Sequence, residues 1–321
     1  MMTACFVFFK EMTMTKVCVF PGQGSQSIGM GKDLYENFAV AKDVFNEVDD
    51  ALNVKLSDVI FDGNIEELTA TENAQPALLA MSMAVWAVLQ KELGVKITDF
   101  AYAAGHSLGE YGALCATEAL SLKEAAKLLR KRGFAMAEAA KNQKGLMAAI
   151  IGMDKEQVQS LVQDTGCYLA NDNSIGQIVI SGTVENIEKA CVKAKEMGAK
   201  RALPLNVAGA FHSPLMQSAA DQMKEVLAET NFKTPIIPVV SNVLALPMTD
   251  VDQIKDLLYK QITGQVRWTE TIQWLKQANV DTVVEMGAGK VLTGLVKRIE
   301  PDMQTFNIND LASIDEFKKV F

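Results

Sequence analysis

Histidine and cysteine are scarce in this chain of 321 residues. There are only two histidines, His106 and His212, and five cysteines, at positions 5, 18, 115, 167 and 191. The sequence has no C-x-x-C pair and no Cys/His cluster of metal-ligand spacing, so we expect no metal site. An odd number of scattered thiols argues against a disulfide framework and favours a reducing cytoplasm as the location.

Basic charge and long apolar runs are also lacking. The 31 Lys and Arg residues are outnumbered by 39 Asp and Glu residues, which gives a formal net charge of −8. This charge argues against a nucleic-acid partner, because neutralising phosphates needs a basic face. The apolar run from Ala4 to Phe9 is too short for a membrane span or a secretory signal, so we expect no membrane partner. Because Met12 and Met14 precede a strand-like run, we interpret residues 1–13 as an upstream-start artefact or a short, disordered tail.

The pentapeptide Gly105-His106-Ser107-Leu108-Gly109 is typical of a nucleophile elbow. An apolar run over 100–104 leads into it, and a helical run over 110–114 follows. On such a turn the glycines leave room for tight packing, the serine is held at an exposed apex, and the first N–H groups of the helix can stabilise an oxyanion. The alternative is a glycine-rich helix N-terminus capped by the serine, since G-x-S-x-G also arises by chance.

A serine nucleophile needs a base, and the chain offers only two candidates. His106 is the immediate neighbour of Ser107, and adjacent side chains diverge in an elbow. His212 therefore remains as the base. It lies in a loop of small residues before a helical run, where a base can be positioned, although a lone loop histidine can also be an ordinary surface residue.

The length and the order of patterns predict an α/β fold built from two units. Only 7% of the residues are aromatic while 49% are apolar, which suits an α/β enzyme with tightly packed helices. For the larger unit we predict a parallel-sheet, α/β-hydrolase-like core. Its predicted elements are strands at 17–20, 100–104 and 236–242 and helices at 33–52, 75–93, 122–141 and 215–229.

A β-α-β-β-α-β order occupies residues 146–205 and predicts a ferredoxin-like unit. It separates Ser107 from His212 in the chain, so we interpret it as a subdomain inserted into the larger one. The predicted boundaries are 14–142 and 208–321 for the large catalytic domain and 143–207 for the small subdomain. The cleft between them would hold the substrate.

Two glycine-rich loops resemble nucleotide-binding motifs but fail in detail. The loop that starts with Gly22-Gln23-Gly24 has Ser27 where G-x-G-x-x-G requires its last glycine. The loop Gly287-Ala288-Gly289-Lys290 lacks the spacing of a phosphate-binding loop, and we interpret it as a helix start. We therefore expect no nucleotide cofactor.

Several motifs together resemble those of the malonyl-CoA:acyl-carrier-protein transacylases. They cover most of the chain, from about residue 15 to about residue 307, in the order and approximate spacing of that family. In chain order they are Phe20-Pro21-Gly22-Gln23-Gly24-Ser25-Gln26, Gly105-His106-Ser107-Leu108-Gly109-Glu110, Gly209-Ala210-Phe211-His212-Ser213, Val266-Arg267-Trp268 and Gly289-Lys290-Val291-Leu292. The resemblance implies that Ser107 and His212 form the catalytic dyad.

The resemblance also implies a role for Arg132. This residue occupies the family position whose guanidinium grips the free carboxylate of malonate. The chemistry suits that role, because a planar fork binds a carboxylate with two parallel hydrogen bonds and is left buried and unpaired by a neutral acyl group. The other cations on the same predicted helix, Lys127, Arg130 and Lys131, are either a solvated face or a patch that attracts an acidic carrier protein or coenzyme A phosphates.

Four further roles rest on matching positions in the family. The backbone N–H groups of Gln23 and Leu108 are implied to hold the oxyanion, and the main-chain carbonyl of Gln261 is implied to orient the histidine. Phe211 is expected to restrict space beside the base. One departure is Gln265, which stands where the family pattern has a proline, so the loop is expected to be less rigid here.

The implied activity is transfer of malonyl from malonyl-CoA to the phosphopantetheine thiol of acyl carrier protein, through a malonyl-serine ester. The main alternative is an esterase or thioesterase of the α/β-hydrolase class, which usually has its histidine near the chain end and has no evident use for Arg132. An inactive docking module would require Ser107, His212 and Arg132 to coincide by chance. The sequence leaves open whether the carrier serves fatty acid or polyketide synthesis, and we expect a monomer.

Overall fold

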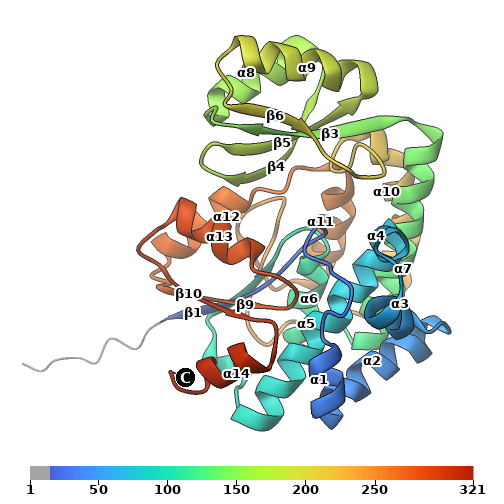
Figure 1. Cartoon of the computed structure of the whole chain (residues 1–321), viewed down its shortest axis with the longest axis vertical. Helices are drawn as coiled ribbons and strands as arrows, with labels where there is room; N and C mark the ends of the chain where they lie inside the picture. Colours follow the sequence, from blue (N-terminus) through green and yellow to red (C-terminus); the bar gives the residue numbers. More distant parts are fainter. Residues whose placement is uncertain (1–14, 321) are drawn as a thin grey trace, which may run out of the picture.

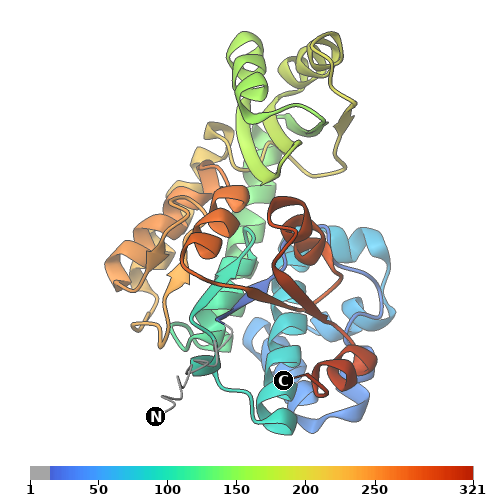
Figure 2. The same cartoon turned by 90° about the vertical axis from the view of Figure 1, so that its left-hand side faces the viewer.

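The computed structural model describes residues 15–320, and the predicted tail at residues 1–13 lies outside this range. The described chain forms two β-sheets with their helices (Figure 1). The larger sheet has six strands, and the smaller sheet has four. A second view, turned by 90°, shows the smaller sheet above the larger one (Figure 2). Among residues 15–320, no helix has the length and apolar character needed to cross a bilayer.

The six-stranded sheet has the order β10-β9-β1-β2-β7-β8. All neighbours are parallel except β8, which runs antiparallel to β7. From the central β1 the chain continues to β2 on one side, and β9 and β10 later fill the other side. The strands are β1 (Lys16–Phe20), β2 (Tyr102–Gly105), β7 (Val239–Val240), β8 (Pro247–Met248), β9 (Thr282–Met286) and β10 (Gln304–Ile308). Such a reversal of strand order opens a crevice at the carboxyl ends of the strands, where α/β folds bind ligands.

Alternation along β1 divides the core between the two faces of this sheet. Cys18 and Phe20 pack in the core that contains α5, α6 and α7, whereas Val17 and Val19 pack in the core that contains α12 and α13. Figure 1 shows α12 and α13 on one side of the sheet and α5, α6 and α14 on the other. Both faces are covered, which explains why the central strand β1 is apolar from Val17 to Phe20 instead of alternating with polar residues.

The helices of the larger part surround this sheet. They are α1 (Lys32–Asn37), α2 (Ala39–Leu52), α3 (Leu56–Asp62), α4 (Ile65–Thr69), α5 (Thr71–Leu93), α6 (Gly109–Ala116), α7 (Leu122–Asn142), α10 (Gln217–Glu229), α11 (Val251–Thr263), α12 (Trp268–Gln277), α13 (Val291–Ile299) and α14 (Leu311–Phe317), with 3-10 turns η1 (Ile97–Asp99) and η2 (Pro214–Met216). The hydroxyl of Ser121 accepts the N–H of Glu124 and so caps α7, which begins at the predicted residue 122. Helix α5 is buried along most of its length.

The four-stranded sheet has the antiparallel order β4-β5-β3-β6. Its elements are β3 (Gly145–Ile151), α8 (Lys155–Thr165), β4 (Tyr168–Ser174), β5 (Gln177–Thr183), α9 (Val184–Glu196) and β6 (Arg201–Pro204). Ile150 and Ile180 pack with α8 and α9 on one face, whereas Met147 and Val179 point to the other face and join the main core. The order is that of the predicted ferredoxin-like unit on an α/β-hydrolase-like core.

Two predicted elements differ from the observed ones by more than small shifts of their ends. The helix predicted over 33–52 is two helices, because Phe38 has extended backbone angles, φ −126° and ψ 119°. The strand predicted over 236–242 is limited to Val239–Val240. It ends there because Ala245 donates its N–H to the carbonyl of Ser241 at 2.8 Å and turns the chain. This early end places Asn242, two residues after the strand, beside the carboxyl end of β2.

Candidate active site

Ser107 lies at the apex of the sharp turn between β2 and α6. Its φ of 53° is in the left-handed region, which a non-glycine residue adopts only where the surroundings enforce it. A Cβ on Gly105 would lie 2.0 Å from the Gly109 backbone, and one on Gly109 would lie 2.2 Å from the carbonyl oxygen of Phe20. Both glycines are therefore needed for the turn, as the elbow motif predicts.

His212 faces the serine from the loop before η2. Its Nε2 lies 2.9 Å from Ser107 Oγ, and its Nδ1 lies 2.9 Å from the carbonyl oxygen of Gln261 and 3.2 Å from that of Gly264. Two carbonyl oxygens can only accept, so Nδ1 carries the proton and Nε2 presents its lone pair to the serine hydroxyl. This is the tautomer that a general base requires.

The surroundings of His212 keep its ring neutral. Burial, followed by the nearby charge of Arg132, lowers the pKa of His212 to about 3, although the carbonyl oxygens of Gln261 and Gly264 act in the opposite direction. Desolvation disfavours the charged imidazolium, and so does a neighbouring cation. The ring therefore stays neutral, with its Nε2 lone pair free, over the whole physiological pH range.

Arg132 projects from the middle of α7 into the same site and is only 1% exposed. It donates to the side-chain oxygen of Gln75 at 2.7 Å, to that of Gln261 at 2.9 Å and to Ser107 Oγ at 3.2 Å. None of the ion pairs found within residues 15–320 includes Arg132. Burial lowers its pKa below the usual value, which reflects the cost of a buried cation without a paired carboxylate. The guanidinium is thus available to an anionic ligand beside the serine.

A network behind the serine was not predicted from the sequence. Asn242 accepts the N–H of Ser107 at 2.6 Å and donates to the carbonyl of Gly105 at 2.6 Å, so it clamps both sides of the elbow. Glu110 Oε2 accepts from the backbone N–H of Asn242 at 3.0 Å and from Gln261 Nε2 at 2.9 Å. The only sequence signal for Glu110 was its place after the G-x-S-x-G motif, and Asn242 and Gln75 offered none of comparable strength.

A cavity of about 320 Å³ opens above these residues. The elbow, α7 and the loop after β1 form one wall, and the free face of the four-stranded sheet forms the other. Its lining comprises Gln23, Gly24, Gln26, Thr69, His106, Ser107, Arg132, Met136, Met147, Asn171, Asn173, Val179, Leu205, Asn206, Val207, Phe211 and His212. This cavity therefore lies between the two sheets, and the serine, the histidine and the arginine all line it.

Two backbone N–H groups near Ser107 are candidates for binding an oxyanion. Within residues 15–320, the N–H groups of Gln23 and Leu108 donate to no other protein group. Gln23 lines the cavity, whereas Leu108 directly follows Ser107 and its side chain, 2% exposed, packs in the core. Phe211 is 5% exposed and lines the cavity beside His212, and its carbonyl accepts the hydroxyl of Ser181 at 2.5 Å.

His106 does not approach the serine hydroxyl as a base. Its Nε2 lies 2.8 Å from Asn173 Oδ1 on β4, and its ring packs against Trp268 with centroids 5.7 Å apart. Divergence of adjacent side chains in the elbow was the ground for preferring His212, and the observed contacts agree with that reasoning. His106 instead connects the elbow to the four-stranded sheet.

The loop with Gln265 in place of a family proline is tied to the smaller sheet on both sides. Val266 donates its N–H to the carbonyl of Ala170 at 2.8 Å, and its own carbonyl accepts the N–H of Asp172 at 2.9 Å. Lys155 on α8 pairs with Asp172 at 3.0 Å and with Glu270 on α12 at 2.7 Å. These bonds hold the loop that supplies the Gly264 carbonyl, so its position does not depend on a proline.

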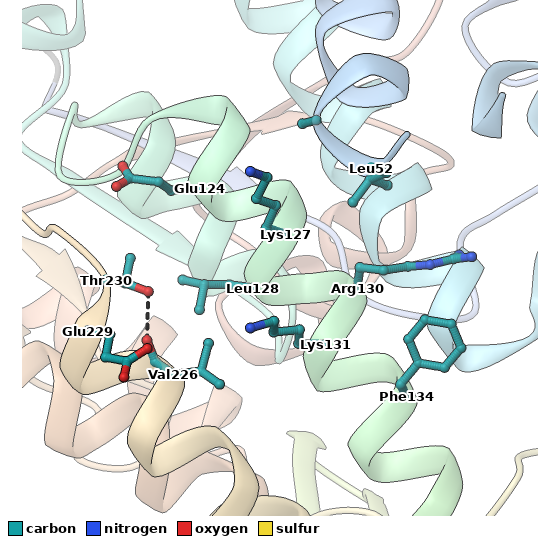
Figure 3. A pocket seen from close by; sticks show the side chains of 11 residues that line it. Leu52, Glu124, Lys127, Leu128, Arg130, Lys131, Phe134, Val226, Glu229 and Thr230 are labelled. Atoms are coloured by element: carbon teal, nitrogen blue, oxygen red, sulfur yellow. Dashed lines mark hydrogen bonds between the residues drawn. The ribbon is translucent and has the colours of Figure 1, made fainter. Parts of the chain in front are cut away.

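The basic residues near Arg132 line a different pocket, of about 460 Å³, between α2, α7 and α10. Figure 3 shows Lys127 and Lys131 projecting to the same side of α7, with Glu124 and Glu229 at the rim. Arg130 points the other way, donates to the carbonyl of Glu72 at 2.9 Å and has its guanidinium carbon 4.8 Å from the Phe134 ring centroid. The predicted patch is therefore reduced to the two lysines.

The fold and the site together define the class of protein. A model of the acyl transferase domain family matches residues 17–311, and this range contains every residue of the site described above. The chain is an acyltransferase.

Named relatives narrow the class further. A malonyl CoA-acyl carrier protein transacylase of Bacillus subtilis is 50% identical over 308 residues, covering 94% of this chain and 96% of that protein. A crystal structure of an acyl-carrier-protein-S-malonyltransferase from Bartonella henselae matches with a TM-score of 0.93 and 48% identity over 96% of this chain and 99% of the other. A type II PKS acyl-carrier protein in complex with its malonyl-transacylase gives a TM-score of 0.91 and 40% identity over 95% of this chain and 99% of that one. This chain belongs to the malonyl CoA-acyl carrier protein transacylase family.

Proposed function

We propose that the enzyme moves malonyl from malonyl-CoA to the phosphopantetheine thiol of acyl carrier protein, and so supplies the extender unit for fatty acid synthesis. The observation that carries this proposal is the buried, unpaired guanidinium of Arg132, which lies 3.2 Å from Ser107 Oγ. In a malonyl thioester a single methylene separates the reacting carbonyl from the carboxylate. A carboxylate paired with Arg132 therefore leaves the carbonyl beside the serine.

The proposed reaction has two steps of the same kind. Ser107 Oγ attacks the thioester carbonyl while His212 Nε2 takes the hydroxyl proton, and the N–H groups of Gln23 and Leu108 stabilise the oxyanion. The C–S bond then breaks, and His212 returns the proton to the coenzyme A thiolate. In the second step the carrier thiol gives its proton to His212 and attacks the malonyl-serine ester. The ester C–O bond then breaks, and His212 returns the proton to Ser107 Oγ. Gln261 orients His212 through its main-chain carbonyl in place of the acid of a triad.

We propose different roles for the two units, because each contributes its own wall of the cavity. Residues 14–142 and 208–321 form the large domain with the dyad, and the subdomain at 143–207 covers the substrate. Phe211 limits space beside the base, so a methyl branch on the malonyl group is disfavoured. The scattered free thiols fit the cytoplasm as the location.

A burst assay separates this proposal from the hydrolase alternative. With malonyl-CoA and no acceptor thiol, the transferase should release about one equivalent of coenzyme A and then wait, because the malonyl ester persists until a thiol arrives. Addition of acyl carrier protein should restart the release. Continuous release of malonate without a thiol would instead identify a hydrolase.

We expect the rate of Ser107 acylation to stay level from about pH 8 to about pH 5, given the lowered pKa of His212. An imidazole of ordinary pKa gains a proton and loses its lone pair as the pH falls through 6.5, whereas here that loss is displaced to about pH 3. The measurement is the single-turnover acylation rate across this pH range. A descending limb centred near the ordinary value would show that the ring is not held neutral.

Charge reversal of Lys127 and Lys131 together should slow association with the acidic carrier protein at low salt. The effect should reach about tenfold and disappear at high salt, because exposed charges steer encounter but are screened. The matched control is reversal of Lys318 and Lys319, an exposed pair after α14. Equal salt profiles for the two double variants would show that Lys127 and Lys131 form only a solvated face.

A further inference from the structure

We infer that Glu110 is a positioning residue, which fixes the side-chain amide of Gln261 and through it the guanidinium of Arg132. This inference rests on the proposed malonyl transfer and goes beyond the dyad and its carboxylate-binding arginine. Glu110 does not line the cavity and is 0% exposed, so it cannot touch a substrate. Its effect on the reaction must therefore pass through the groups that it contacts.

Gln261 contacts the histidine, the arginine and the serine of the proposed site. Its main-chain carbonyl accepts from His212 Nδ1 at 2.9 Å, and its Oε1 accepts from Arg132 at 2.9 Å. Its Nε2 donates to the carbonyl of Ser107 at 3.0 Å and to Glu110 Oε2 at 2.9 Å. Both amide hydrogens and the amide oxygen are thus used, and the side chain is 0% exposed.

The amide of Gln261 could in principle be reversed, and Glu110 opposes that reversal. A reversed amide would point its N–H groups at the guanidinium, which only donates, and its oxygen at Glu110 Oε2 and the Ser107 carbonyl, which only accept. An acceptor at position 110 therefore sets which end of Gln261 faces Arg132. The same Oε2 accepts the backbone N–H of Asn242, so the clamp on the elbow depends on the same atom.

The environment of the second oxygen, Glu110 Oε1, shows whether the positioning of Gln261 needs the charge of Glu110 or only its acceptor oxygen. Oε1 is buried and has no hydrogen-bond partner among the described residues, while Oε2 accepts twice. Burial raises the pKa of Glu110 to about 7, against the opposing effects of Asn242, Gln261 and Arg132. A neutral carboxyl with its proton on Oε1 keeps both bonds to Oε2, so the positioning needs the acceptor oxygen and not the charge.

Two substitutions by side chains of nearly the same size as glutamate separate the acceptor oxygen from the charge. Glu110→Gln keeps an acceptor at the Oε2 position, and kcat/KM for malonyl-CoA and for acetyl-CoA should stay within about threefold of the wild type. Glu110→Met removes the acceptor and lets Gln261 and the guanidinium move, which a carboxylate substrate senses and an acetyl group does not. The ratio of malonyl to acetyl kcat/KM should then fall about tenfold to a hundredfold.

Two controls exclude a general loss of stability. Glu285→Met removes another carboxylate with 0% exposure, which accepts the N–H groups of Leu292 and Thr293 at the start of α13. It should lower Tm and leave the malonyl-to-acetyl ratio unchanged. In a Gln261→Met background, Glu110→Met should lower the ratio no further, because its effect acts through Gln261.

The outcomes distinguish this inference from the proposed function. A wild type that transfers no malonyl would overturn both. An active wild type whose ratio is unchanged by Glu110→Met would overturn the positioning role alone, as would ratio losses that add in the Gln261→Met background. A Glu110→Gln variant as impaired as Glu110→Met would show that the charge, and not the acceptor, is what the site requires.

Discussion

His212→Ala should lower the acylation rate by about 10²- to 10⁴-fold, the range that a positioned general base contributes. Nε2 is 2.9 Å from Ser107 Oγ, and within residues 15–320 no other imidazole is bonded to that hydroxyl. Without His212, the proton of Ser107 must pass to water. Water has little access to this place, because His212 is only 5% exposed in the wild type. The measurement is the single-turnover rate of malonyl-enzyme formation.

His106→Ala is the matched control, because the two histidines are the only ones in the chain. His106 bonds to Asn173 and packs on Trp268, so its loss should weaken the contact between elbow and small sheet and cost far less than the loss of His212. If the two variants rank in the opposite order, His212 is not the base, and the site must be assigned afresh.

Arg132→Ala should separate substrate selection from chemistry. Removing one partner of a desolvated charge pair costs about 3 to 5 kcal/mol, which is about two to three and a half powers of ten in kcat/KM for malonyl-CoA. Acetyl-CoA has no carboxylate, so in its complex the same change removes only an unpaired buried cation. Acetyl transfer should be equal or improved.

The neighbouring Arg130→Ala provides the control for this prediction. Arg130 lies on the same helix but bonds to Glu72 and packs on Phe134, away from the cavity. Its loss should change neither substrate's kcat/KM by more than a few-fold. An equal fall for malonyl-CoA and acetyl-CoA in Arg132→Ala would mean that Arg132 supports the fold or the coenzyme, and the malonyl assignment would lose its physical basis.

The parts of the site that could be predicted are those that the sequence encodes locally. The elbow needs a glycine on each side of Ser107, and the whole motif occupies five adjacent residues of the sequence. His212 follows from the count of histidines, because only two are available as a base. The β-α-β-β-α-β order of short strands and helices at 146–205 likewise predicts the ferredoxin-like topology of the small sheet. Arg132 could also have been noticed without a family, because it lies in the buried stripe of α7 with Leu128, Leu129 and Met136.

The rest could not be predicted, because it depends on contacts between distant parts of the chain. Asn242 clamps an elbow 135 positions earlier, and it can do so only because the predicted strand stops at Val240. Glu110 looks like an ordinary first-turn acidic residue until α11 brings Gln261 against it across 151 positions. Spacing along the sequence does not show such pairs, because sheet order and helix packing decide them.

Intact-mass measurement after addition of malonyl-CoA, followed by mapping of the acylated residue, tests the central claim most directly. A wild-type chain should gain the mass of one malonyl group, carried by Ser107 as an ester that acyl carrier protein then removes. Ser107→Ala should show no gain and an unchanged Tm, because a hydroxyl at the apex of the elbow contributes little to packing. A malonyl group on any other residue, or a gain that persists in Ser107→Ala, would contradict transfer through a malonyl-serine ester.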